Sequence, residues 1–335
     1  MRDKSYYLYG FIKTPQNPLT LSLQGVGQSP VLLSSAHGYA LVASELSGGE
    51  LTHSSRSELL SHLATHQRVL EEMMYLGEVI PMKFGTVVKG DKCLDLLCTE
   101  SKSVVEESFE EVQGKIEFDL MVRFSDLKKT LIALSQKPGI QALQNPKVTP
   151  SKKTQLALGK KIDEALQKMK RACAKTIVER LSNTTLSILE FETTQEEMVA
   201  SLACLIKKEG EATLEGEIQA LDIAYEDQLH FRLVGPMPCN SFHALEIEQI
   251  PVEALAWARA SLNLSESFTL SELKKAYKTA SLRLHPDQKA APKSETLSFE
   301  TIHSSYRLLS DFFENQSRFQ TEEGWFGVRP ARGGP

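Results

Sequence analysis

The sequence predicts an α+β fold built from two α+β domains, the second with a long coiled-coil-like helix, and a small all-α helical-hairpin module. Three observations predict it. Residues 1–136 alternate between short strand-like runs and helical stripes. Residues 154–181 predict one long helix with an apolar stripe from Ile162 to Ile177. Residues 252–318 contain helical periodicity alone.

Composition sets the expected domain boundaries. Prolines interrupt residues 137–153, which we expect to form a linker between the α+β domains. The last residues are rich in Gly, Pro and Arg, a composition typical of disordered chain. The expected parts are 1–136, the first α+β domain; 137–153, the linker; 154–250, the second α+β domain; 252–318, the helical module; and 319–335, a disordered tail.

Strand-like and helix-like runs alternate in the first domain. Residues 5–12 are rich in tyrosine and predict a strand, and residues 31–35 and 39–46 flank Gly38 as a hairpin. Residues 57–76 predict a helix that begins after Ser57 as the N-cap. Its apolar stripe contains Leu59, Leu60, Leu63, Val69, Leu70, Met73 and Met74. Strand 79–88, helix 91–112 and strand 115–124 follow.

The second domain begins with the long helix 154–181. Its seam residues are spaced by four, three, four and four, which is typical of packing on another helix: Ile162, Leu166, Met169, Cys173 and Ile177. We interpret its many lysines as a solvated face. Further elements are expected at 186–192, 198–206, 228–234 and 244–250 as strands and at 209–224 as a helix.

Composition and motifs exclude several classes of function. The net charge of −5 and the pI near 6.0 give no global basic field for nucleic acid or an anionic membrane. The five cysteines form no CxxC pair, so we expect reduced, mostly buried thiols. Because the sequence shows neither the apolar core of a signal peptide nor an apolar run of membrane length, we expect the protein in the cytoplasm. No P-loop, GxSxG or GxGxxG motif occurs.

One histidine pair could suggest a metal site. His62 and His66 are spaced i, i+4 on a predicted helix, but no third ligand is apparent, so we interpret them as part of a solvated helix face. We therefore expect no enzyme activity, no metal and no cofactor.

The helical module contains two matched apolar stripes, spaced by three or four residues: Leu270, Leu273, Tyr277, Ala280 and Leu284, then Phe299, Ile302, Tyr306 and Leu309. Thr269 and Glu272 form a capping-box pattern before the first stripe, and residues 252–262 predict a short preceding helix. Pro286 ends the first helix, so His285, Pro286 and Asp287 begin a loop between two antiparallel helices. On its own, this tripeptide could be only a helix stop.

The polar face of the first of these helices is basic. Lys274, Lys275, Lys278 and Arg283 are opposed only by Glu272, a local charge of +3 in a protein of net charge −5. Such a face is expected to attract an acidic partner surface.

The stretch LSELKKAYKTASLRLHPDQ, followed by FETIHSSYRLLSD, closely resembles a J-domain of the DnaJ co-chaperone family. The resemblance implies docking on a DnaK-type chaperone ATPase and stimulation of its hydrolysis. His285, Pro286 and Asp287 would be the trigger, and Lys274, Lys275, Lys278 and Arg283 would be docking contacts. The fourth helix of that family is short or absent here, and no zinc-binding region follows.

Several segments between residues 5 and 245 resemble, in order, the gas vesicle protein L/F family: YYLYGFI, EEMMYLGEVIPMKFGTVV, KIEFDLMVRF, LGKKIDEAL and LVGPMPCNSF. Lys83 stands where the family has arginine, and Met237 where it has tryptophan. Two motifs are possible partner-binding elements, although both could be purely structural: Pro81, Lys83, Phe84, Gly85 and Thr86, and Gly235, Pro236, Pro238 and Phe242.

These resemblances imply a gas vesicle assembly accessory that binds the hydrophobic shell subunit and other gas vesicle accessory proteins, and that recruits a DnaK-type chaperone. The expected location is the cytoplasm, in association with gas vesicles, without nucleic acid or membrane partners. The alternative is a structural minor component of the vesicle shell with a degenerate J-like domain. An unrecognised enzyme is a weaker reading, which a cleft of perturbed ionisable groups would favour.

Overall fold

The computed structural model describes residues 4–15, 22–46, 51, 55–141, 152–284, 298–314, 317–321 and 324–331. These residues form two compact units. Unit 1 contains the described residues up to Glu111 together with those from Ala244 to Ala331, and unit 2 contains residues 112–243. Unit 1 is therefore discontinuous in sequence, and the division falls earlier than the predicted linker at 137–153.

Unit 1 opens with a five-stranded antiparallel sheet of order β2-β3-β1-β4, with β5 also paired to β1. Its elements are β1 (Ser5–Lys13), a 3-10 turn (Val26–Gln28), β2 (Val31–Ala36), β3 (Tyr39–Leu46), α1 (Arg56–Met74), β4 (Val79–Pro81), β5 (Val87–Lys89), α2 (Asp91–Glu100) and α3 (Lys102–Val112). The predicted hairpin is confirmed, and the predicted strand 79–88 is two short strands joined by a turn. The predicted helix 91–112 is broken at buried Ser101.

Helix α1 differs from its prediction at its start. Its N-cap is Ser55, not Ser57: Ser55 Oγ accepts from Glu58 N at 3.2 Å, and the Glu58 carboxylate accepts from Ser55 N at 3.1 Å. Only the C-terminal half of the helix packs on the sheet, through Val69, Leu70 and Met73. The predicted stripe residues Leu59, Leu60 and Leu63 are exposed, because this half of the helix lacks a packing partner among the described residues.

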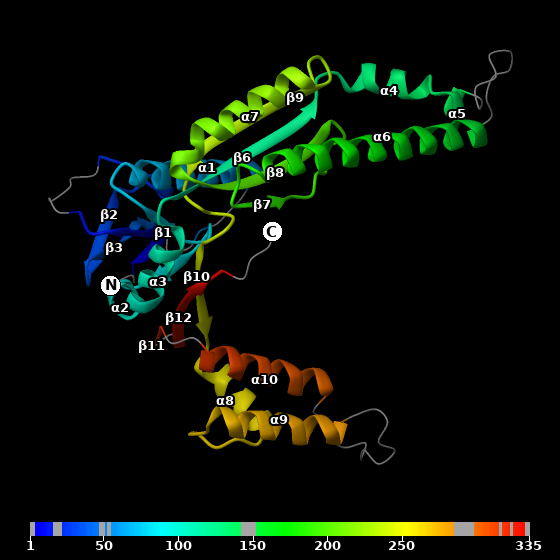
Figure 1. Cartoon of the computed structure of the whole chain (residues 1–335). Helices are drawn as coiled ribbons and strands as arrows, with labels where there is room; N and C mark the ends of the chain where they lie inside the picture. The colour runs from blue at the N-terminus through cyan, green and yellow to red at the C-terminus, as the bar shows by residue number, and fades with distance from the viewer. Residues whose placement is uncertain are drawn as a thin grey trace. The chain divides into compact units, whose positions relative to one another are not determined.

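The second part of unit 1 begins with β10 (Leu245–Ile250) and contains α8 (Val252–Ser261), α9 (Leu270–Leu284), α10 (Phe299–Glu314), β11 (Arg318–Thr321) and β12 (Gly324–Pro330). Helices α9 and α10 lie side by side (Figure 1). After α10 the chain returns to β10, and the three strands form a sheet of order β10-β12-β11.

The prediction of a disordered tail at 319–335 is therefore wrong where the tail overlaps β11 (Arg318–Thr321) and β12 (Gly324–Pro330). Phe319, Phe326 and Val328 are buried, and the two phenyl rings stack with centroids 5.7 Å apart. The Gly, Pro and Arg content suggested disorder, but burial of these apolar side chains and pairing with β10 order the strands.

Unit 2 is a four-stranded antiparallel sheet of order β7-β8-β6-β9 with helices. Its elements are β6 (Lys115–Phe124), α4 (Leu127–Ser135), α5 (Pro138–Gln141), α6 (Lys152–Leu181), β7 (Ser187–Glu190), β8 (Met198–Lys207), a 3-10 turn (Lys208–Gly210), α7 (Glu211–Ala224) and β9 (Leu229–Met237). Strand β6 was expected in the first domain. It belongs to unit 2 because β8 and β9 flank it.

The long helix α6 contacts α4, α5, α7 and β8. Its inner side buries Leu166, Ile177 and Leu181, and its lysines are exposed except for buried Lys170. Within the described part of the chain, no helix combines the length and the apolar character needed to cross a bilayer.

Candidate functional site

The α9–α10 hairpin is held by the two predicted stripes. Leu273, Ile302 and Leu309 are buried in one cluster, and Tyr277 stacks on Tyr306 with ring centroids 4.2 Å apart. Tyr277 Oη also lies 3.1 Å from Nδ1 of His303. Burying three such side chains stabilises the hairpin by roughly 5 kcal/mol relative to exposing them. This packing fixes which side of α9 remains in solvent.

The start of α9 is capped as predicted. Thr269 N donates to the Glu272 carboxylate at 2.7 Å, and Glu272 N donates to Thr269 Oγ1 at 3.3 Å. The hydrogen bonds from Thr269 lower the pKa of Glu272. A capping box of this kind stabilises the first turn of a helix, because it gives hydrogen-bond partners to N–H groups that the helix itself cannot pair. The cap therefore defines where the exposed face of α9 begins.

The predicted docking residues lie on that exposed face. All four side chains are exposed: Lys274, Lys275, Lys278 and Arg283. The helix that carries them, α9, packs on α10. The result is a row of cations on a fixed helix. His285, Pro286 and Asp287 lie outside the described residues, so their position relative to the row is a prediction.

The first gas vesicle motif forms a tight turn between β4 and β5. Thr86 N and Thr86 Oγ1 donate to the Lys83 carbonyl at 3.2 and 2.6 Å. Gly85 has a φ of +86°, a region in which L side chains are strained. Pro81 is buried at the end of β4, while Lys83 is exposed. Pro81, Gly85 and Thr86 therefore each have a structural role in the turn, whereas the Lys83 side chain is exposed to solvent.

A buried aromatic cluster supports the turn from below. Tyr7 Oη accepts a hydrogen bond from Gly85 N at 3.1 Å and lies 2.9 Å from His66 Nδ1. The His66 ring stacks on Tyr9 and meets Phe84 edge-on, each at 5.6 Å between centroids. Our interpretation of His66 as part of a solvated face is wrong. Burial lowers its pKa to about 4, so this imidazole is neutral near pH 7.

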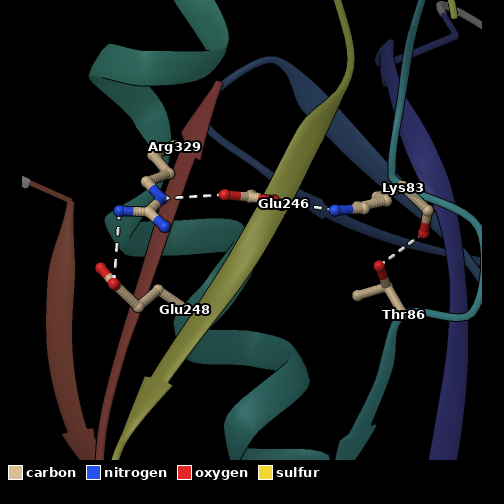
Figure 2. A network of polar contacts seen from close by, with 5 residues as sticks. All are labelled: Lys83, Thr86, Glu246, Glu248 and Arg329. Atoms are coloured by element: carbon tan, nitrogen blue, oxygen red, sulfur yellow. Dashed lines mark hydrogen bonds and ion pairs between the residues drawn. The ribbon is translucent and has the colours of Figure 1, made fainter. Parts of the chain in front are cut away.

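Neighbouring strands join the turn through a charge network (Figure 2). Glu246 Oε2 lies 3.4 Å from Lys83 Nζ, and Glu246 Oε1 lies 3.0 Å from Arg329 Nε. Arg329 Nη1 is also 3.3 Å from Glu248. The two carboxylates are only 17% and 18% exposed, so this network is less screened than isolated surface pairs. It links the first motif to strands β10 and β12.

The second gas vesicle motif spans the end of β9 in unit 2, with Gly235 and Pro236 inside the strand and Pro238 and Phe242 after it. It is anchored by buried Glu117 of β6. Ser241 N and Ser241 Oγ donate to the two Glu117 oxygens at 2.9 and 2.6 Å. Burial raises the pKa of Glu117 to about 7, while the Ser241 hydrogen bonds oppose the shift. Sequence reasoning missed this anchor, because Glu117 stands at a polar position of the alternating strand 115–124 and nothing in the pattern indicates its burial.

The other residues of the second motif are held tightly. A Cβ at Gly235 would lie 2.6 Å from the Phe118 ring and 2.9 Å from the Glu117 carbonyl oxygen. Pro238 is buried, Pro236 is exposed, and Phe242 is half-buried. The two motifs are thus in different units, and each is organised by its own neighbours.

Ionisable groups with strongly shifted pKa values lie in both units. His66 and Glu117, whose pKa values are strongly shifted, are each engaged by structural partners in separate units. Across the residues that the structure describes, no group of three His, Cys, Asp or Glu could hold a metal ion. Four of the five cysteines are buried, as expected, and Cys173 is half-buried.

Fold and site together define a class of protein: an α+β body that carries a J-type helical hairpin with an exposed cationic row. The model of the family "Gas vesicle synthesis protein GvpL/GvpF" matches residues 5–244, and a DnaJ domain model matches residues 260–318. The chain belongs to the GvpL/GvpF family and carries a DnaJ domain in addition.

Individual relatives agree with this division. Gas vesicle protein F of Microcystis aeruginosa is 23% identical over 231 residues, 68% of this chain and 92% of the relative. The mitochondrial DnaJ homolog 1 of Saccharomyces cerevisiae is 32% identical over 107 residues, 32% of this chain and 20% of that protein. The crystal structure of GvpF from Anabaena shares the fold, with a TM-score of 0.58 at 23% identity, over 71% of this chain and 98% of that one.

Proposed function

We propose that this protein is a non-enzymatic assembly factor of gas vesicles, which binds the hydrophobic shell subunit through its GvpL/GvpF part and recruits a DnaK-type chaperone through its DnaJ domain. It would act in the cytoplasm, in association with vesicles and their other accessory proteins. The observation that carries the proposal is the cationic row of α9, exposed on a hairpin whose opposite side is packed.

The chemistry of the row supports a protein partner of opposite charge. Lys278 lies one helical turn after the adjacent Lys274 and Lys275, so the three cations share one side of α9. Glu272 is the single acidic residue among the described residues of α9. Complementary charges across an interface speed association and select partners. Holding a client and an ATPase on one chain raises their effective concentration for each other.

The test is the ATPase rate of a DnaK-type chaperone with the purified full-length protein. We expect the wild-type protein to stimulate the ATPase rate. In the triple variant Lys274→Glu, Lys275→Glu, Lys278→Glu this stimulation should be at least tenfold weaker. The matched control reverses three exposed lysines of α6, Lys160→Glu, Lys161→Glu and Lys168→Glu, and should stimulate normally. His285→Gln should also abolish stimulation.

A chaperone that responds equally to no protein and to wild type would contradict recruitment. The rival role, a structural shell component, predicts that the protein stays with washed vesicles in a fixed ratio. Shell binding is tested separately, by whether the purified protein keeps the shell subunit in the supernatant after centrifugation.

A further inference from the structure

Strand β10 is an edge strand that neither family model covers. The GvpL/GvpF match ends at residue 244 and the DnaJ match begins at residue 260, whereas β10 spans Leu245–Ile250. Of the described strands, β10 pairs along its length only with β12. Its other edge meets the rest of unit 1 at a single parallel bridge, Met82 to Leu245.

The hydrogen-bond register shows which backbone groups of β10 face this outer edge. Ala331 N donates to Ala244 O at 2.7 Å, so position 244 faces β12. The next carbonyl, that of Leu245, instead accepts from Lys83 N at 2.7 Å, on the outer side. Leu245 lies opposite Pro330, which has no N–H to offer.

Because successive residues of a strand direct their backbone groups to opposite edges, Ile247 and Gln249 also face outward. Val328, opposite Ile247, agrees with this register: its N–H donates away from β10, to Ser317 O at 3.3 Å. The N–H and C=O groups of Ile247 and Gln249 therefore lie along the outer edge of β10, in the arrangement with which a further strand would pair.

A groove runs beside these groups. It has a volume of about 350 Å³ and is lined by the Lys83–Val87 turn on one side, by Glu246, Ile247 and Gln249 on the other, and by Phe326. The turn ends the pairing with β10 after one bridge, because its Thr86–Lys83 hydrogen bonds bend the chain away. A Cβ built on Gly85 would have no atom within 4 Å, so the space beside the turn is open.

We propose that this groove is a strand-addition site that takes an extended segment of the gas vesicle shell subunit. Backbone pairing with Ile247 and Gln249 supplies affinity for an extended chain. The groove is built jointly by a turn of the GvpL/GvpF part and by the strand that leads into the DnaJ domain. A client held there lies where the two parts of the chain join.

This inference rests on the proposed function for the identity of the client. It is tested by fluorescence anisotropy with overlapping short synthetic peptides that cover the shell subunit, using the full-length protein. The variant Gln249→Pro removes the outward N–H without touching the β10–β12 hydrogen bonds, and edge strands tolerate proline at such a position. Gln249→Ala is the matched control, because it shortens the same exposed side chain and keeps the N–H.

We expect at least one peptide to bind wild type and the alanine variant alike, and to bind the proline variant at least tenfold more weakly. Bound peptide should also slow amide hydrogen exchange at Ile247 and Gln249. Near-ultraviolet circular dichroism shows whether the proline variant keeps its fold. If it does not, the exchange measurement on wild type decides alone.

Equal binding by all three proteins, without slowed exchange at these amides, would overturn the groove while leaving shell binding intact. Failure of every peptide to bind wild type would overturn the groove as a shell-subunit site. Chaperone recruitment is measured independently by the ATPase assay, so a failure of the groove proposal can be distinguished from a failure of recruitment.

Discussion

The two gas vesicle motifs of the chain differ in the space around their glycines. Gly235 is confined by the Phe118 ring and the Glu117 backbone, whereas Gly85 has open space on its Cβ side. The second motif is anchored by a buried carboxylate, and the first rests on Tyr7 and borders a groove. Similar residue types therefore serve two purposes: the Gly235 segment at the end of β9 maintains the fold of unit 2, and the Gly85 turn shapes an accessible surface.

The largest expected effect separates the two glycines directly. Gly235→Ala should destabilise unit 2 by about 4 kcal/mol, because it adds a collision to an unfavourable φ of +147°. Gly85→Ala should cost about 1 kcal/mol, from backbone strain alone. Urea denaturation of both variants checks this. Equal costs would remove the distinction between the confined glycine of β9 and the open glycine of the turn.

The Glu117 anchor should give unit 2 a pH dependence. Its pKa is raised from 4.5 to about 7 in the folded state, so the folded protein retains a proton that the unfolded chain releases. Stability should therefore fall as pH rises from about 4.5 to 7, by up to about 3 kcal/mol. Glu117→Gln removes this titration.

The measurement compares unfolding free energies of wild type and Glu117→Gln at several pH values. His66, whose folded pKa is lowered, destabilises both proteins equally below pH 6.5 and cancels in the difference. A difference that does not change with pH would show that the anchor does not titrate.

The support of the Gly85 turn is tested by Tyr7→Phe. Loss of this buried hydroxyl leaves Gly85 N and His66 Nδ1 without the hydrogen bonds that it makes. We expect a cost of about 2 kcal/mol in thermal or urea unfolding of unit 1. The cost should be absent from a probe of unit 2, and a change there instead would contradict the separation of the two motifs.

The smallest expected effect concerns the turn itself. Thr86→Val keeps the shape of the side chain but removes the 2.6 Å hydrogen bond to the Lys83 carbonyl. We expect a loss of about 1 kcal/mol, and recovery of most of it in Thr86→Ser, which restores the hydroxyl. Identical stability of the valine and serine variants would show that the turn does not depend on this bond.

Local pattern was enough for the DnaJ hairpin. The spacing of Leu273 and Tyr277 on α9, and of Ile302 and Tyr306 on α10, predicted the packed sides of both helices, and Thr269 with Glu272 predicted the cap. These signals are contained within one or two helical turns, which is why a single sequence reveals them. The exposed cationic row follows as the opposite side of the same helix.

The local sequence pattern did not predict which residues distant along the chain contact one another. The sequence by itself determined the helical stripes, the hairpin and the family motifs, because each depends on residues close along the chain. Only the tertiary structure decided that β6 joins unit 2, that His66 is buried against Tyr7, and that Phe319 and Phe326 order the predicted tail. Each of these outcomes depends on contacts between residues distant in sequence, and their burial outweighs local composition.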